Sequence, residues 1–316
     1  MENTNHTMVI YFIIKGISDI PELQIPIFLL VLLIFVITIG GNVTIFLLVC
    51  LDPQLHTPMY FFLGNLSIID ISSISLTLHK ILVAFATGDK TIGFLNCVIQ
   101  MYIFSCLGSN ELLILTAMSY DRYVAICKPL HYHMVMSPKV CVLLASACWV
   151  IGFGELLPYI ILVSHFSCYT SNIINHFFCD LVPLVKLSCS DTRVFQLVMI
   201  TEGLVLIGLA PFLLTFISYV FIIVSIMKIR CNVGRRKAFY TCSSHLTVVS
   251  LLYLTLFWQY QRPTSTDALA SNKLFSLFNT AAVPMLNPLI YSLKNKDVKS
   301  ALRRRRKFFE MLFEIK

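Results

Sequence analysis

The chain has 316 residues, of which 57% are hydrophobic and only 13% are charged, with a mean hydropathy of +0.81 and a formal net charge of +8. Average soluble domains carry about 25% charged residues, so this composition excludes an ordinary soluble fold. The apolar residues come in long blocks, which indicates that lipid is the solvent. The positive charge does not indicate nucleic-acid binding, because no soluble basic domain is present to carry it.

Seven stretches in chain order have roughly the 20 apolar residues that are needed to cross a hydrocarbon core about 30 Å thick. They cover residues 26–49, 58–79, 94–120, 140–165, 194–227, 239–260 and 274–293. Lipid cannot satisfy backbone polar groups, so these stretches must be helices or strands of a closed barrel. Barrel strands would alternate over about ten residues, and no stretch alternates. The sequence therefore predicts an all-α membrane protein: an N-terminal tail (1–25), a seven-transmembrane helix bundle (26–293) and a C-terminal tail (294–316).

The distribution of Lys and Arg predicts how the bundle is oriented. Of the 24 basic residues, 17 fall on the side of the C-terminus and 7 on the side of the N-terminus. Because cytosolic loops carry the excess of Lys and Arg, we expect a multi-pass plasma-membrane protein with its N-terminus outside and its C-terminus in the cytosol. Asn5 begins a glycosylation sequon in the outer tail. Four cysteines also fall on the outer side, where an oxidising compartment favours disulfides: Cys97, Cys168, Cys179 and Cys189.

The C-terminal tail has apolar residues at helical spacing with basic residues between them. This pattern predicts a short amphipathic surface helix on the inner leaflet, where membrane lipid is its partner. The alternative is a basic tail without regular structure. The residues at helical spacing are Val298, Ala301, Leu302, Arg305, Phe309, Leu312 and Phe313.

Acidic residues inside predicted spans are costly and therefore indicate function. Asp70 lies in the middle of the second span and Glu111 in the lower middle of the third. Together they could hold a small cation, since hard oxygen ligands suit such an ion. Two protonated carboxyl groups bonded to neighbouring hydroxyls are the alternative. Glu155 and Glu202 lie in the outer halves of spans four and five, and we hypothesise that they are neighbours sharing a proton. An ordinary hydrogen bond between helices is the alternative for that pair.

The triplet Asp121-Arg122-Tyr123 lies after the third span at its cytosolic end. An arginine beside a carboxylate can be neutralised or released to meet a partner, as a two-state switch requires. The alternative is an arginine at the membrane interface whose side chain only extends into water, which would give the same triplet. Near the end of span seven, Asn287, Pro288 and Tyr291 combine a helix kink with polar groups, which favours the switch.

Several longer runs resemble the hallmark stretches of olfactory (odorant) receptors, a family of rhodopsin-like G-protein-coupled receptors. The runs are LHTPMYFFLGNLSIID (55–70), MSYDRYVAICKPLHY (118–132), KAFYTCSSHL (237–246), PMLNPLIYSLKNKDVKSAL (284–302) and HFFCDLVPLVKLSCSDT (176–192). The last of these runs, in an outer loop, is most similar to the terrestrial, airborne-odorant class. The resemblance covers essentially the whole chain.

The resemblance implies roles for particular residues of this chain. It pairs Cys97 with Cys179 and Cys168 with Cys189, and it makes Asp70 and Glu111 a possible sodium site. It also makes Asp121, Arg122 and Tyr123 the G-protein switch, together with the asparagine, proline and tyrosine of span seven. Tyr219 and Tyr291 would be the tyrosine companions of Arg122 in the active state.

The ligand cavity is expected among the outer halves of spans three, five, six and seven. Helical spacing groups the residues of span three on one face, and the resemblance supplies the others. The set is mostly apolar with a few hydroxyls, as suits a small volatile molecule. It consists of Met101, Phe104, Ser105, Gly108, Ser109, Gly203, Leu204, Ile207, Gly208, Tyr253, Leu256, Phe257, Tyr260, Leu277 and Thr280.

The function implied is that of a receptor: a small volatile odorant binds, and a heterotrimeric stimulatory G protein is activated to raise cyclic AMP. Two other classes of protein are less consistent with the sequence. A transporter would show internal repeats and paired broken helices, and neither is found. An intramembrane enzyme would carry a metal-binding or nucleophile motif, and none is found, so we expect neither enzyme activity nor a cofactor beyond the possible sodium ion. The sequence does not indicate an oligomeric state.

Overall fold

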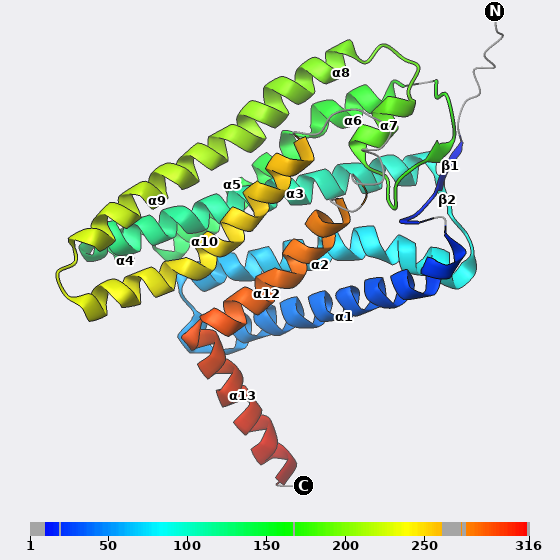
Figure 1. Cartoon of the computed structure of the whole chain (residues 1–316). Coiled ribbons are helices and arrows are strands. Elements are labelled where there is room, and N and C mark those ends of the chain that lie inside the picture. The colour runs from blue at the N-terminus through cyan, green and yellow to red at the C-terminus, as the bar shows by residue number, and fades with distance from the viewer. Residues whose placement is uncertain (1–9, 19, 167, 261–272, 274–275, 315–316) are drawn as a thin grey trace, which may run out of the picture.

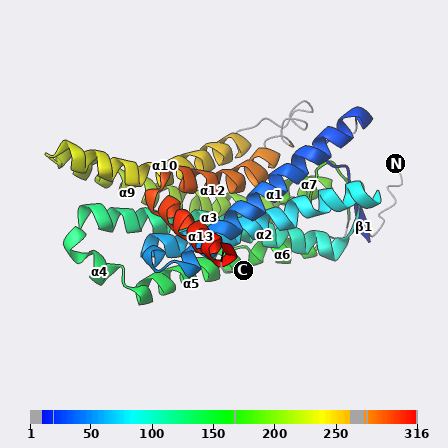
Figure 2. The same cartoon turned by 90° about the horizontal axis from the view of Figure 1, so that it is seen from below.

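The computed structural model describes residues 10–18, 20–166, 168–260, 273 and 276–314. Long helices lie side by side in a bundle along a roughly common axis (Figures 1 and 2). Within the described residues, six helical segments are long and apolar enough to cross a membrane. They are Pro21–Leu51 (α1), Pro58–Thr87 (α2), Phe94–Cys127 (α3), Pro138–Ser164 (α5 with α6), Arg193–Lys228 (α8, η3 and α9) and Asn232–Phe257, within α10 (Asn232–Tyr260).

The seventh predicted span falls on two consecutive helical elements, η4 (Phe278–Ala282) and α12 (Val283–Lys294). These elements pack against α1, α2 and α10, so they complete the bundle. The first two residues of this predicted span, 274 and 275, lie outside the described residues, as does the sequon residue Asn5.

The helix ends are explained by local sequence. Helices α1, α2, α5 (Pro138–Gly154) and α6 (Leu157–Ser164) each carry a proline in the first turn, where no backbone N–H is needed. Helix α2 ends at Gly88, whose φ of 75° suits glycine. Helices α3 and α10 extend beyond the predicted spans because their charged ends continue the helix outside the apolar core, which hydropathy alone does not detect.

Two of the spans are not continuous α-helices. Span four is interrupted at Glu155 and Leu156, and Pro158 lies in the first turn of the next helix. Span five consists of α8 (Arg193–Val198), a π-helical stretch η3 (Met199–Leu209) and α9 (Ala210–Lys228). Proline lacks the N–H that would bond to the preceding turn, so a change of winding before Pro158 and before Pro211 is the expected consequence.

A small sheet, which the sequence analysis did not predict, covers one end of the bundle, here called the sheet end. Strand β1 (Tyr11–Ile14) pairs antiparallel with β2 (Thr91–Gly93) and parallel with β3 (Ile173–Ile174). Phe12 of β1 is fully buried, and its ring lies 5.3 Å from that of Tyr169 and 6.1 Å from that of Phe94. The segment that precedes α1 is therefore part of the packed structure.

Two disulfides join segments of the sheet end. Cys97, in the first turn of α3, is bonded to Cys179, which precedes α7 (Leu181–Leu187). Cys168 is bonded to Cys189. These are the pairs that the resemblance implies. Because the loop between α6 and α7 is held at both places, it stays folded over the ends of the helices.

The opposite end of the bundle, called the α13 end, carries three short elements and the C-terminal helix. The short elements are η1 (Pro53–Leu55), η2 (Pro129–His131) and α4 (Tyr132–Val135). Helix α13 (Lys296–Glu314) leaves the bundle at an angle (Figure 1), so the predicted amphipathic helix forms.

Polar contacts fasten the start of α13 to the bundle. Arg304 forms an ion pair with Asp52 at 2.7 Å, and the hydroxyl of Tyr60 donates to Asn295 and Asp297. Burial raises the pKa of Asp52, but hydrogen bonds from Arg304 and the backbone N–H of Gln54 and the nearby positive charges outweigh it, and the pKa is lowered overall. The carboxylate is therefore ionised at neutral pH, and its contribution to stability is lost only as the pH falls through the lowered pKa.

Helices α1 and α12 approach closely at Gly41. A Cβ atom at Gly41 would lie 2.9 Å from Cγ of Pro288, whereas one at Gly40 would meet nothing within 4 Å. On the same face of α1, Asn42 donates to the backbone oxygen of Pro284 at 3.0 Å. A glycine at position 41 thus lets the kinked helix α12 lie against α1.

Gly41→Ala and Gly40→Ala form a matched pair of variants. Gly41→Ala forces the two helices apart and should cost about 1–3 kcal/mol as an overpacking substitution. Gly40→Ala removes a glycine from an exposed helix position and should stabilise by up to about 1 kcal/mol. Thermal denaturation of the purified proteins tests this. Equal melting temperatures of the two variants would contradict the close approach at Gly41.

Candidate functional site

The centre of the bundle holds a buried polar cluster formed by three helices. Asp70 of α2 accepts a hydrogen bond of 2.9 Å from the side-chain amide of Asn287 in α12, and Glu111 of α3 interacts electrostatically with the same amide. Asp70 is 1% exposed and Asn287 is 2% exposed. The two carboxyl groups interact electrostatically, so both sequence-predicted acids are near one another.

Each of these carboxyl groups keeps an oxygen without a hydrogen bond. Among the described residues, Oδ1 of Asp70 and Oε1 of Glu111 are buried and have no partner. Unsatisfied buried oxygens are costly, and a small cation or a proton would satisfy them. The two carboxylates are hard oxygen ligands, which suit a small cation. The residues therefore fit the predicted cation.

A second polar cluster lies at the α13 end and contains the predicted switch residues. Arg122 forms an ion pair of 3.1 Å with Asp121, and the same carboxylate accepts a hydrogen bond of 2.8 Å from the hydroxyl of Tyr132 in α4. Asp121 is completely buried. Tyr123 is half-buried and packs against Phe221 of α9 with ring centroids 5.9 Å apart. Arg122 is thus held by its neighbour, in the neutralised arrangement that the sequence analysis considered.

Tyr219 lies in the same region but contacts a residue that the sequence analysis did not single out. Its hydroxyl shares a hydrogen bond of 2.6 Å with Nδ1 of His245 in α10, and the two rings are nearly parallel. His245 is fully buried and interacts electrostatically with Arg122. A histidine inside a predicted span was itself a signal of function. Tyr291 is fully buried, and its hydroxyl has no partner among the described residues.

The predicted ligand residues fall on the sheet-end halves of α3, span five, α10 and span seven. On α3, Met101 is buried, Phe104 contacts Phe178 with ring centroids 4.8 Å apart, and Ser105 is half-buried. Gly108 is exposed, and a Cβ atom there would meet nothing within 4 Å. Ser109 donates a hydrogen bond to Glu155. This face of α3 therefore combines aromatic, small and hydroxyl side chains.

The other predicted ligand residues are less uniform. Ile207 and Leu256 pack against the central apolar core, and Tyr253 contacts Phe212 with ring centroids 5.1 Å apart. Gly203 lies near the hydroxyl of Tyr159, and Gly208 lies near the backbone of Gly203. Leu277 packs beside α1 and α2, Thr280 bonds to its own helix, and Phe257 is 58% exposed. The side chains of Leu204 and Tyr260 lie outside the described part of the chain.

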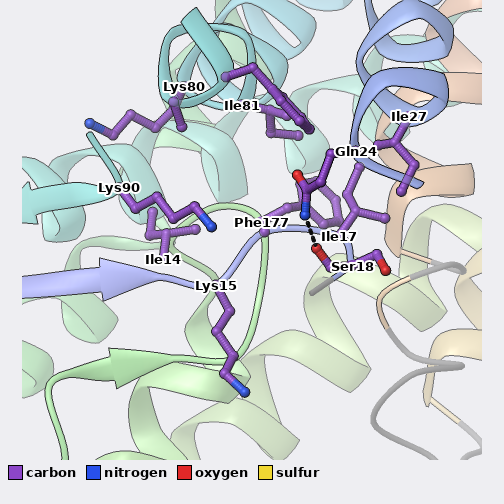
Figure 3. Close-up of a pocket in the computed structure, with 13 residues that line it drawn as sticks. Ile14, Lys15, Ile17, Ser18, Gln24, Ile27, Lys80, Ile81, Lys90 and Phe177 are labelled. Atoms are coloured by element: carbon purple, nitrogen blue, oxygen red, sulfur yellow. Dashed lines mark hydrogen bonds between the residues drawn. The ribbon is translucent and has the colours of Figure 1, made fainter. Parts of the chain in front are cut away.

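A pocket that the structure describes lies elsewhere at the sheet end, between β1, α1 and α2 (Figure 3). None of the predicted ligand residues lines it. Sequence reasoning could not have found this pocket, because it depends on strand β1 and on the fold of the segment that precedes α1.

Glu155 and Glu202 are neighbours, as hypothesised. Their carboxyl groups repel each other, and Ser109 donates to Glu155. Among the described atoms, Oε2 of Glu202 is buried without a hydrogen bond. Whether the two carboxyl groups share a proton stays a prediction.

Asn287→Ala removes the amide that donates a hydrogen bond to Asp70. The loss leaves this buried carboxyl group without that donor, and we expect a cost of about 1–3 kcal/mol. Thr77→Val is a suitable control, because among the described residues the buried hydroxyl of Thr77 bonds only to its own helix, at Ser73. If Asn287→Ala lowered the melting temperature no more than Thr77→Val does, the amide of Asn287 would not be what holds the cluster together.

Comparison with known proteins identifies relatives along the full chain. A family model described as olfactory receptor matches residues 31–308. Olfactory receptor 5AR1 of Mus musculus is 45% identical, over 96% of this chain and 98% of its own length. Olfactory receptor 5G9 of Mus musculus is 46% identical, over 96% of each chain. Olfactory receptor 6C74 of Homo sapiens is 43% identical, over 99% of each chain.

Proposed function

We propose that this chain, which belongs to the olfactory receptor family, binds a small volatile odorant within the helix bundle and activates a stimulatory G protein. The family consists of multi-pass membrane receptors and not of enzymes. The family membership makes this an odorant receptor with a seven-transmembrane fold. The location of the ligand site, the orientation of the termini and the identity of the G protein are the parts that we propose.

The odorant site that we propose lies between α3, span five, α10 and span seven in the sheet-end half of the bundle. The open face at Gly108 supports it, since a glycine with no atom near its missing Cβ leaves room beside the central helix. The neighbouring Phe104 offers an aromatic wall, and the hydroxyl of Ser109 joined to Glu155 offers a polar edge. A mostly apolar site with a few convergent polar groups suits a small volatile molecule.

The G protein docks at the α13 end, which we propose faces the cytosol, while the sheet end faces outside. The excess of Lys and Arg at the α13 end supports this orientation. So do the two disulfides at the sheet end, since bridges form in an oxidising compartment. The docking surface combines Arg122, the basic segment 228–237 and α13.

The observation that carries the signalling proposal is the buried ion pair of Asp121 and Arg122. An odorant that binds better to a state with α9 and α10 parted at the α13 end shifts the population toward that state. In that state Arg122 leaves Asp121 and meets Tyr219 and Tyr291. Tyr219 also shares a hydrogen bond with His245, so a movement of Tyr219 toward Arg122 would alter that contact, and we include His245 in the same switch.

We further propose that Asp70, Glu111 and Asn287 hold a sodium ion in the resting state. The two buried oxygens without a hydrogen bond support this, as does the hard chemistry of the donors. The ion would balance the two negative charges, which otherwise repel each other at the centre of the bundle.

A screen of volatile compounds in cells that report cyclic AMP tests the main proposal. We expect at least one odorant to raise cyclic AMP, and Arg122→Ala to abolish the response without loss of surface expression. Arg193→Ala is the matched control, because Arg193 lies at the sheet end with 91% of its side chain exposed and should keep the response. A response that survives Arg122→Ala would contradict the role of this arginine.

Thermal denaturation in sodium chloride against choline chloride at equal ionic strength tests the ion site. Sodium should raise the melting temperature of the purified receptor, and Asp70→Asn should remove that increase because it takes away one of the two charged ligands. The proposal fails if sodium has no effect on the natural sequence, or if Asp70→Asn leaves the effect intact.

A further inference from the structure

The pocket at the sheet end has an apolar wall and a basic rim (Figure 3). It lies where the segment before α1 crosses the ends of α1 and α2. The thirteen described residues that line it include three lysines and no Asp or Glu. The lysines are Lys15, Lys80 and Lys90, and the apolar wall consists of Ile14, Ile17, Ile27, Ile81, Phe85 and Phe177.

Local structure fixes the segments that form this pocket. Gly16, with φ of 88°, turns the chain after β1, and the side chain of Gln24 donates to the backbone oxygen of Ser18 at 2.8 Å. On the other side, Asp89 accepts hydrogen bonds from the backbone and the hydroxyl of Thr91. Lys90 lies between these two residues, and its backbone oxygen accepts from Ile14 at 2.9 Å. The position of Lys90 is therefore set by the sheet.

The three lysine side chains differ in direction. In Figure 3 the ammonium group of Lys90 reaches toward Phe177 and Ile17, whereas those of Lys80 and Lys15 extend away from the centre. Lys80 is also near Asp89, whose charge it offsets in part. Lys90 is consequently the cation that faces the apolar wall, and Lys80 adds positive potential at the opening.

We propose that this pocket binds a short alkyl carboxylate, with the carboxylate at Lys90 and the chain against Ile17, Ile81 and Phe177. A positive group beside an apolar wall complements an anion that carries a hydrocarbon chain. The cavity volume is about 120 Å³, which is about four times the ~30 Å³ that one water molecule takes up in the liquid. A cavity of this size suits a short alkyl chain such as that of hexanoate, and not the two acyl chains of a phospholipid.

The pocket is a second site, separate from the proposed odorant site, but aromatic contacts connect the two. Phe177 lines the pocket and lies 5.0 Å from Phe178, and Phe178 lies 4.8 Å from Phe104 on the odorant face of α3, measured between ring centroids. All three rings pack in one cluster. A ligand that fixes Phe177 thus acts on a wall of the odorant site.

Binding of hexanoate to the full-length receptor in phosphatidylcholine nanodiscs tests the proposal directly. Hexanamide, which has the same shape without the charge, should bind at least tenfold more weakly. The double variant Lys80→Gln/Lys90→Gln should lose at least tenfold in hexanoate affinity. Lys186→Gln is the matched control, since Lys186 lies at the sheet end in α7 but does not line the pocket, and it should bind as the natural sequence does.

Ala84→Phe gives an independent variant without a change of charge. Ala84 lines the pocket and is only half-buried, so a larger side chain there fills the cavity without entering the helix core. This variant should abolish hexanoate binding while the melting temperature of the receptor stays within a few degrees. Equal affinity for hexanoate and hexanamide would overturn the proposal, and so would unchanged binding in the double lysine variant.

A last arm separates a free carboxylate from a lipid headgroup, which shares the anionic chemistry. Phosphatidylglycerol added to the nanodiscs at one lipid in five should leave hexanoate affinity unchanged. Competition by this lipid that disappears in Lys80→Gln/Lys90→Gln would show that the pocket binds a headgroup phosphate instead, and would overturn the assignment of a free carboxylate.

Discussion

The hydrogen bond between Asp70 and Asn287 shows the constraint on which the rest of the structure depends. Lipid offers no hydrogen-bond partners, so polar side chains in the interior must pair with each other across helices. The same rule explains why Asn42 of α1 bonds to the backbone of span seven, and why Trp149 of α5 bonds to Asn65 of α2. These contacts select one arrangement of helices among the many that apolar packing alone would allow.

The two ends of the bundle are held by different means. At the sheet end, two disulfides and a three-stranded sheet restrict the movement of the segments that they join. At the α13 end, Arg122 is held by an ion pair and Tyr219 by a hydrogen bond to His245. Such contacts can be exchanged for others at little net cost, whereas a disulfide cannot. One end held in place and one end with exchangeable contacts suit a receptor that changes between two states.

The sequence predicted the features that strong local patterns determine. Long apolar blocks placed the helices, acidic groups inside them led to Asp70 and Glu111, and the triplet at the end of the third block led to Arg122. The sheet was missed because strands of two to four residues pair across distant segments and carry little pattern of their own. His245 was missed because its partner, Tyr219, comes from another helix. The pocket around Lys90 was missed for a similar reason, since three separate segments form it.

The central claim is that buried polar pairs hold the resting arrangement of the helices. Double electron–electron resonance tests it by measuring the distance between spin labels at Met134 and Val233. Both side chains are exposed, at 71% and 77%, and lie on α4 and α10 at the α13 end. Without odorant, the natural sequence should give one dominant distance, and Asp121→Asn should add a population at longer distance, because Arg122 loses its charged partner. Identical distance distributions in the two proteins would contradict the claim.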